Sequence, residues 1–192
     1  MARLRRECPW DARQTHRSLV QYLVEETAET VEAIETDDAV LLREELGDLL
    51  LQVVFHAEIS AEQPGGFDLD DVAAGVADKL VARHPYVFAD ADIPTDLLGS
   101  WEKRKAVEKG RRSAVDGIPE PLSALARAHK VVTRARSHGV AVALPSDPID
   151  APEVGAALLD LVARAHAGGV DPDQALRTAV RELEQDVRAL EG

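Results

Sequence analysis

The chain has 192 residues, of which 45% are hydrophobic and 30% charged, a composition typical of a globular protein with its own core. Its 22 Lys and Arg residues are outnumbered by 35 Asp and Glu residues, which gives a net charge of −13. This charge argues against binding to nucleic acid or to an anionic membrane, because both need a basic face. It suits a protein that binds cations, or one that binds an anion through a metal ion.

The cysteine content and the hydropathy pattern favour a cytoplasmic protein. Cys8 is the only cysteine, so we expect no internal disulfide and no zinc site built from cysteines. No apolar stretch reaches the ~18 residues that a membrane span needs. The arginines near the N-terminus are not followed by an apolar segment, so we expect no secretory signal.

Apolar residues recur at spacings of three and four, and alternation of period two is almost absent, so we predict an all-α fold. The first helix is predicted over about 15–36 with Thr15 as its N-cap, and a turn at Asp37 and Asp38 leads into a second helix over 39–62. A third helix follows Asp68 and ends before Pro85. The short connections favour antiparallel neighbours in a helical bundle. Four more helices are predicted over about 96–109, 122–137, 153–167 and 172–190, with breaks rich in Pro and Gly at 110–121 and 139–152.

Two acidic pairs lie on the first two predicted helices. Glu26 and Glu29 are three residues apart, as are Glu45 and Asp48, so each pair lies on one face of its helix. Counted outward from the turn, the two pairs are level to within about one residue, or roughly 1.5 Å of rise. Four carboxylates therefore converge if the two faces look at each other.

Such convergence is unfavourable without a cation, because neighbouring carboxylates repel each other. Oxygen ligands without His or Cys select Mg²⁺ or Mn²⁺ rather than zinc, and these ions commonly bridge to phosphate. Acidic residues three apart are also common on solvated helix faces, so the residues alone leave both interpretations open. Glu25 and Glu44 either face solvent or support the ligands from outside. Gly47 costs about 1 kcal/mol relative to Ala inside a helix, and close approach of a neighbour or ligand is one reason to carry it.

A polyphosphate ligand would also need cationic side chains, and two later helices carry them. Lys79 and Arg83 share one face of the third predicted helix. Trp101 and Lys105 share one face of the fourth, where the indole is suited to stacking on a base. Basic residues on helices are more often simply solvated, so this pattern is weaker evidence than the acidic pairs.

Several segments resemble the MazG nucleotide pyrophosphohydrolases, over about residues 8–118. The resemblance is specific because the E-E-x-x-E and E-x-x-D motifs sit inside long similar flanks. The matching segments are Cys8-Pro9-Trp10-Asp11, Gln14-Thr15-His16, residues 25–29, 43–57 and 67–72, Lys79-Leu80, Arg83-His84-Pro85, Trp101-Glu102 and Lys105.

This resemblance implies an all-α helical bundle of the MazG type, completed by formation of a homodimer. It implies Mg²⁺-dependent cleavage of nucleoside triphosphates between the α- and β-phosphates, with Mn²⁺ as an alternative ion. Glu29 or Glu25 would orient or deprotonate the attacking water, and cationic side chains would stabilise the leaving pyrophosphate. The implied metal ligands and catalytic residues are Glu26, Glu29, Glu45 and Asp48, and the implied substrate-binding residues are Lys79, Arg83, Trp101 and Lys105.

The C-terminal part of the chain resembles a shortened second MazG unit. Residues 45–57 align with 153–165 at 6 of 13 positions, but Asp48 falls opposite Ala156 and no E-x-x-E helix precedes Glu153. We therefore expect a catalytic domain over 1–118, a helix and linker over 119–152, and a degenerate, structural half-unit over 153–192. Helices rich in Leu and Ala also align by chance, so an unrelated tail is the alternative.

Two alternatives to a general nucleoside triphosphate pyrophosphohydrolase, which would cleanse the nucleotide pool, stay open. The first is a narrower hydrolase of the same superfamily, for pyrimidine deoxynucleotides or for phosphoribosyl-ATP, since the choice of base depends on the shape of the pocket. The second is a non-catalytic regulatory or interaction protein, against which the four intact carboxylates argue.

Overall fold

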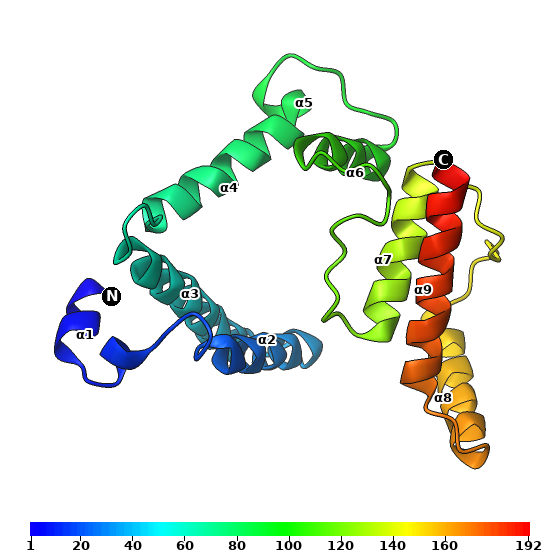
Figure 1. The fold of residues 1–192 in the computed structure, drawn as a ribbon, viewed down its shortest axis with the longest axis horizontal. Helices are drawn as coiled ribbons and strands as arrows, with labels where there is room; N and C mark the ends of the chain where they lie inside the picture. The colour runs from blue at the N-terminus through cyan, green and yellow to red at the C-terminus, as the bar shows by residue number, and fades with distance from the viewer. The chain divides into compact units, whose positions relative to one another are not determined.

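The structure is a computed structural model that describes residues 1–97 and 99–192, together with the backbone of residue 98. Within this described part the chain forms nine α-helices and one short 3-10 helix, with no strand, which confirms the all-α prediction (Figure 1). None of the described helices combines the length and apolar character that crossing a membrane requires. The helices are α1 (Ala2–Glu7), η1 (Asp11–Arg13), α2 (Val20–Glu35), α3 (Ala39–Ala61), α4 (Leu69–Arg83), α5 (Pro85–Phe88), α6 (Leu97–Glu108), α7 (Ala124–Ser137), α8 (Ala151–Ala167) and α9 (Pro172–Glu191).

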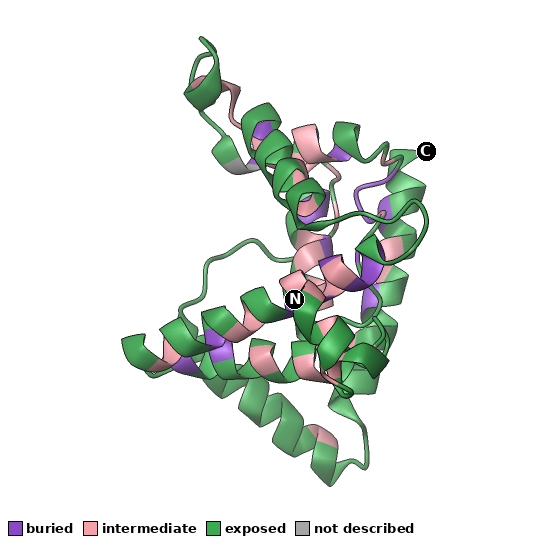
Figure 2. Ribbon diagram, turned by 90° about the vertical axis from the view of Figure 1, so that its left-hand side faces the viewer, coloured by how far each residue is buried: buried purple, intermediate pink, exposed green. Residues whose placement is uncertain are grey.

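The chain divides into two compact units, residues 1–84 and 85–192. The expected domain boundary at residue 118 lies inside the second unit, and the catalytic domain over 1–118 stays a prediction. Buried residues occur only in short stretches, and most of the ribbon is exposed (Figure 2).

The first unit is organised around the antiparallel hairpin of α2 and α3. Asp37 forms the turn with a φ of 53°, a left-handed conformation that aspartate tolerates better than most residues. Asp38 then caps α3, its carboxylate accepting hydrogen bonds of 3.0 Å from the backbone amides of Val40 and Leu41. The turn predicted at these two aspartates is confirmed, and it sets which residues of the two helices are level.

The predicted start of the first long helix was wrong by five residues. Thr15 is not an N-cap, because it forms a closed turn with Ser18: the backbone amide of each residue donates to the hydroxyl of the other, over 2.9 and 3.1 Å. The chain is therefore turned rather than helical over these residues, and α2 begins at Val20.

The segment that precedes α2 is structured, which the sequence did not predict. Arg5 on α1 donates to both carboxylate oxygens of Glu62, at 2.8 Å from Nε and 2.5 Å from Nη2, and to the backbone oxygens of Asp11 and Gln14. The ring of Trp10 lies edge-on to that of Phe55, with 6.3 Å between the ring centres. These contacts hold the N-terminal segment against the end of α3, over a small core of Leu19, Phe55 and Ile59.

The third predicted helix is confirmed as α4. Asp68 is its N-cap and forms a capping box with Asp71, in which each side chain accepts from the other residue's backbone amide. The helix ends at Arg83, as the following Pro85 requires, and this proline instead begins the short helix α5, where its missing amide costs nothing.

The second unit is built around α7 and α9, which pack against each other. Val131 and Ala135 on α7 and Val180 and Val187 on α9 form its core with the 114–118 segment. The helix predicted from residue 153 begins at Ala151 because Asp150 forms a capping box with Glu153. The predicted break before it is confirmed, since no helix occurs between Ser137 and Ala151.

Candidate metal centre

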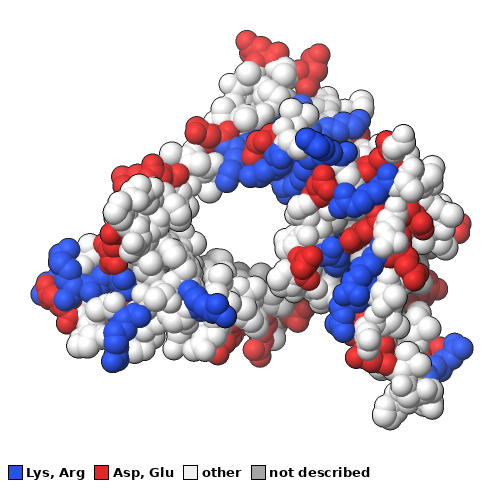
Figure 3. Space-filling model, in the orientation of Figure 1, with Lys and Arg blue, Asp and Glu red and all other residues white. Residues whose placement is uncertain are grey.

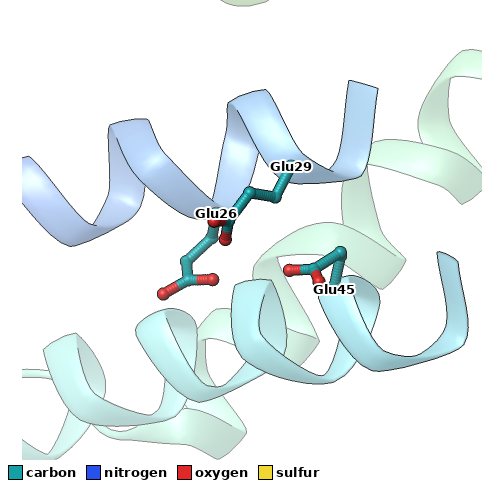
Figure 4. A group of neighbouring side chains, drawn as sticks. All are labelled: Glu26, Glu29 and Glu45. Carbon is teal, nitrogen blue, oxygen red and sulfur yellow. The ribbon is translucent and has the colours of Figure 1, made fainter. Parts of the chain in front are cut away.

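Three carboxylates meet between α2 and α3. Glu26 and Glu29 on α2 and Glu45 on α3 point into the space between the two helices (Figure 4). One oxygen from each carboxylate lies within 4.8 Å of those of the other two. Glu45 is buried, Glu26 is half-buried and Glu29 is exposed, so the cluster lies at the edge of the helix interface.

The charges in this cluster raise the pKa of two of its members. Burial raises the pKa of Glu26, and the charge of Asp48 raises it further, followed by that of Glu29. Burial also raises the pKa of Glu45, and the charges of Glu29 and then Asp48 add to the effect. Asp48 lies outside the group of three but acts on both glutamates. The charge of Asp48 thus acts on Glu26 and that of Glu29 on Glu45, which fits the register that counting from the turn predicts.

The composition of the cluster fits a hard divalent cation. All its donors are carboxylate oxygens, and within the described part of the chain no Lys, Arg or His forms an ion pair with any of them. We predicted that Gly47 allows a neighbouring segment to approach α3 closely, and the fold does not show this. Apart from its two neighbours in the chain and the nearby backbone of its own helix, no atom lies within 4 Å of where its Cβ would be.

The predicted phosphate-binding cations lie elsewhere in the first unit. Lys79 is exposed and Arg83 is buried, both toward the C-terminal end of α4. This helix leads away from α3 (Figure 1), and neither residue is among the groups that shift the pKa values of Glu26 and Glu45. The fold of one chain does not bring these two cations to the carboxylates, and their role in binding substrate stays a prediction.

Trp101 and Lys105 lie on α6, in the second unit, and are both half-buried. Burial lowers the pKa of Lys105, Glu102 raises it, and Lys130, Arg111 and Arg134 lower it. Lys and Arg side chains gather over α6 and α7 (Figure 3). Lys105 thus belongs to a basic cluster on an acidic protein, and its binding of substrate stays a prediction.

A buried ion network in this cluster was not predicted. Oε2 of Glu102 lies 3.6 Å from Nη1 of Arg111 and 3.6 Å from Nε of Arg134. Arg134 also donates to the backbone oxygens of Ala114, at 3.4 Å, and Asp116, at 2.8 Å. The available signal was spacing, because Arg134 follows the core residue Val131 by three positions and so shares its helix face.

Comparison with known proteins identifies the class of this fold and site. Residues 14–88, which include all four carboxylates, match the MazG nucleotide pyrophosphohydrolase domain. The chain is 36% identical over 204 residues to the nucleoside triphosphate pyrophosphohydrolase/pyrophosphatase MazG of Thermotoga maritima, with 96% of this chain and 79% of that protein covered. The chain belongs to the MazG nucleotide pyrophosphohydrolase family, as its motifs indicate.

Two further relatives show how far the similarity extends. The chain is 48% identical over 203 residues to an uncharacterised 26.1 kDa protein of Streptomyces cacaoi, with 100% of this chain and 80% of that protein covered. It is 46% identical over 137 residues to the nucleoside triphosphate pyrophosphohydrolase of Escherichia coli K12, with 69% of this chain covered. The chain spans about half of that relative's length, 52%.

Proposed function

We propose that this chain hydrolyses nucleoside triphosphates to the nucleoside monophosphate and pyrophosphate. The observation that carries the proposal is the convergence of Glu26, Glu29 and Glu45 between two helices, where none of the ion pairs found among the described residues includes them. Family membership supports it, since the E. coli relative is named a nucleoside triphosphate pyrophosphohydrolase.

The same carboxylates, with Asp48, would hold Mg²⁺ or Mn²⁺. The all-oxygen donor set and the raised pKa values of Glu26 and Glu45 support a divalent ion, because each added positive charge relieves the repulsion between carboxylates. Such an ion, when bound, neutralises phosphate oxygens and acidifies water. The carboxylates on the two packed helices would hold the ion that binds the triphosphate. Glu29, the exposed member, would be available to position and deprotonate the attacking water.

Phosphates and base would be bound by Lys79 and Arg83 of the first unit and by Trp101 and Lys105 of the second. The first unit also supports the proposed homodimer, because apolar side chains on α2 and α3 face solvent in the single chain: Val24 is 63% exposed and Leu50 59%. We place this activity in the cytoplasm, since a single cysteine allows no disulfide within the chain and so suits a reducing compartment.

Residues 153–192 would be the degenerate second unit with a structural role. In this region two long helices, α8 and α9, follow each other along the chain, as α3 and α4 do in the first unit. The relatives from Streptomyces cacaoi and Thermotoga maritima align over 96–100% of the chain, so their similarity includes this region. The variant Glu153→Gln keeps a side chain that can complete the helix cap. We expect it to leave hydrolysis unchanged, and a large loss of activity would contradict the assignment.

The proposal is tested by measuring pyrophosphate release from a panel of ribo- and deoxynucleoside triphosphates, with and without Mg²⁺. We expect monophosphate and pyrophosphate as products, and a loss of at least about 100-fold in Glu29→Gln and Asp48→Asn. Glu32→Gln is the matched control, because this exposed residue lies on α2 outside the cluster. Folded protein that releases no pyrophosphate from any nucleotide would favour the interaction protein instead.

A further inference from the structure

A small polar pocket in the second unit is lined by three arginines. Arg127 lines it from α7, and Arg177 and Arg181 line it from α9. The segment before α7 completes the lining with Glu120 and Leu122. Three cations and one anion give this lining a net charge of +2, on a chain whose net charge is −13. The pocket therefore concentrates positive charge on a protein that is acidic as a whole.

The packing of α7 against α9 brings these arginines together. The two helices lie side by side and run in the same direction, so their N-terminal halves are at the same end of the pair (Figure 1). Arg177 and Arg181 are one turn apart on α9 and share one face. Arg127 reaches across to α9 and donates to both carboxylate oxygens of Glu184, at 2.7 Å from Nε and 3.1 Å from Nη2. Its Nη1 also donates to the backbone oxygen of Pro119, at 3.1 Å, so this guanidinium is held in a fixed orientation.

Arg181 has no acidic partner among the described residues. None of the ion pairs found there includes it. Of the residues one turn away on α9, only Glu184 is acidic, and Arg127 binds both of its carboxylate oxygens. Arg177 pairs along its own helix with Asp173, in an exposed contact that solvent screens. Like charges one helical turn apart repel each other, so this group of arginines favours an anion from outside the chain.

The end of α7 beside the pocket adds to the positive charge. Leu122 and Arg127, which both line the pocket, lie at the two sides of the first helical turn. This turn carries no acidic residue, and its cap is the neutral hydroxyl of Ser123, which accepts from the amide of Ala126 at 3.3 Å. The positive end of the helix dipole is therefore not neutralised by a side chain of this turn. The dipole supports the binding of an anion, for which the arginines supply the charge.

We propose that this pocket binds a phosphate or diphosphate group. Guanidinium groups bind phosphate oxygens through paired hydrogen bonds, and three of them line this pocket. Its volume of about 200 Å³ is below the roughly 300–1,000 Å³ of sites that enclose a whole small molecule, so it suits the phosphate end of a ligand. Free pyrophosphate and the terminal phosphates of a nucleotide share this chemistry. The site is formed by the second unit alone and needs no metal ion, so it is independent of the proposed hydrolysis.

The site is tested by isothermal titration calorimetry of the full chain with sodium pyrophosphate, in buffer freed of divalent ions. Without such ions the carboxylates of the first unit repel the anion. We expect a Kd at or below about 1 mM. Arg181→Gln removes a charge-assisted hydrogen bond and should raise the Kd at least about fivefold. Arg164→Gln is the matched control, because it removes the same charge from an exposed arginine of α8 that does not line the pocket, and its Kd should stay within about twofold of wild type.

A variant of opposite sign and a second ligand complete the test. Glu120→Gln removes the acid of the lining and should lower the Kd at least about twofold. Metal-free ATP separates the two sources of phosphate. If ATP binds and Arg181→Gln weakens its binding too, the site accepts the phosphate end of a nucleotide, and if only pyrophosphate binds, its ligand is the free anion. The proposal is overturned if neither ligand binds, or if Arg181→Gln and Arg164→Gln change the Kd equally.

Discussion

The charge of Asp48 on α3 raises the pKa of Glu26 on α2 more than any other carboxylate charge does. The two residues lie on different helices, 22 positions apart in the sequence, and meet because the hairpin turns at Asp37 and Asp38. Between unpaired carboxylates this relationship is repulsive, so the metal-free chain stores unfavourable electrostatic energy at the point where a cation would bind.

This repulsion predicts how the stability of metal-free protein depends on pH. The pKa values of Glu26 and Glu45 are raised above the ordinary value of 4.5. Between the unfolded and the folded pKa the folded state binds more protons, so these groups make the protein less stable as the pH rises through that window. Glu45→Gln should therefore unfold at a higher temperature than wild type at about pH 8, in the presence of a chelator, and at the same temperature below about pH 4.5.

Glu32→Gln is the matched control for this comparison, since it removes one negative charge from an exposed site on α2. Its melting temperature should follow that of wild type at both pH values. If the control gains as much stability as Glu45→Gln, the effect comes from the net charge of −13 and not from the cluster.

Divalent cations should reverse the effect of pH on stability. An ion that binds only the folded chain raises its melting temperature, and the increase grows as the carboxylates lose their protons. We expect Mg²⁺ to stabilise wild type more at about pH 8 than at about pH 5, and to stabilise Glu45→Gln far less at either pH. Scanning fluorimetry with and without Mg²⁺ measures both, and an equal gain in the variant would rule out this cluster as the binding site.

We expect the contacts of Arg5 in the N-terminal segment to stabilise the folded chain, because its guanidinium is buried. Its side chain is 8% exposed and binds Glu62 together with two backbone oxygens. Arg5→Met would leave those oxygens unpaired, so we expect a loss of about 1–3 kcal/mol in the free energy of unfolding by urea. Arg3→Met is the control, because Arg3 pairs with Glu7 on the surface and should change stability by less than about 0.5 kcal/mol.

The same ion pair has a pH dependence of opposite sign. Hydrogen bonding and the charge of Arg5 lower the pKa of Glu62 below its ordinary value, against the effect of its partial burial. The stability that this pair adds is present above the unfolded pKa and is lost as the pH falls through the lowered value. The difference between wild type and Arg5→Met should therefore shrink in acid. A difference that grows there would contradict the ion pair.

We expect Arg134 to contribute strongly to the free energy of unfolding of the second unit. It is 2% exposed, lies between Glu102 and two backbone oxygens, and burial lowers the pKa of its guanidinium. Arg134→Met leaves a buried carboxylate with one partner fewer, so we expect a loss of about 3–5 kcal/mol in unfolding free energy. Arg136→Met on the exposed side of the same helix should be nearly neutral, and equal losses in the two variants would contradict the network.

The elements that local interactions determine could be predicted from the sequence. The turn at Asp37 and Asp38 and the cap at Asp68 follow from spacing and capping within a few residues, where few conformations compete. The convergence of acidic residues was visible for the same reason, because one hairpin with a short turn has only one register.

The remaining features depend on contacts between residues far apart in the sequence. The helix expected from Thr15 begins later because of a local turn, and the N-terminal segment is ordered by Arg5, which meets Glu62 across 57 positions. Neither the direction of α4, which carries Lys79 and Arg83 away from the carboxylates, nor the burial of Arg134 follows from helix periodicity. Periodicity states which residues share a face, and only tertiary packing decides what that face meets.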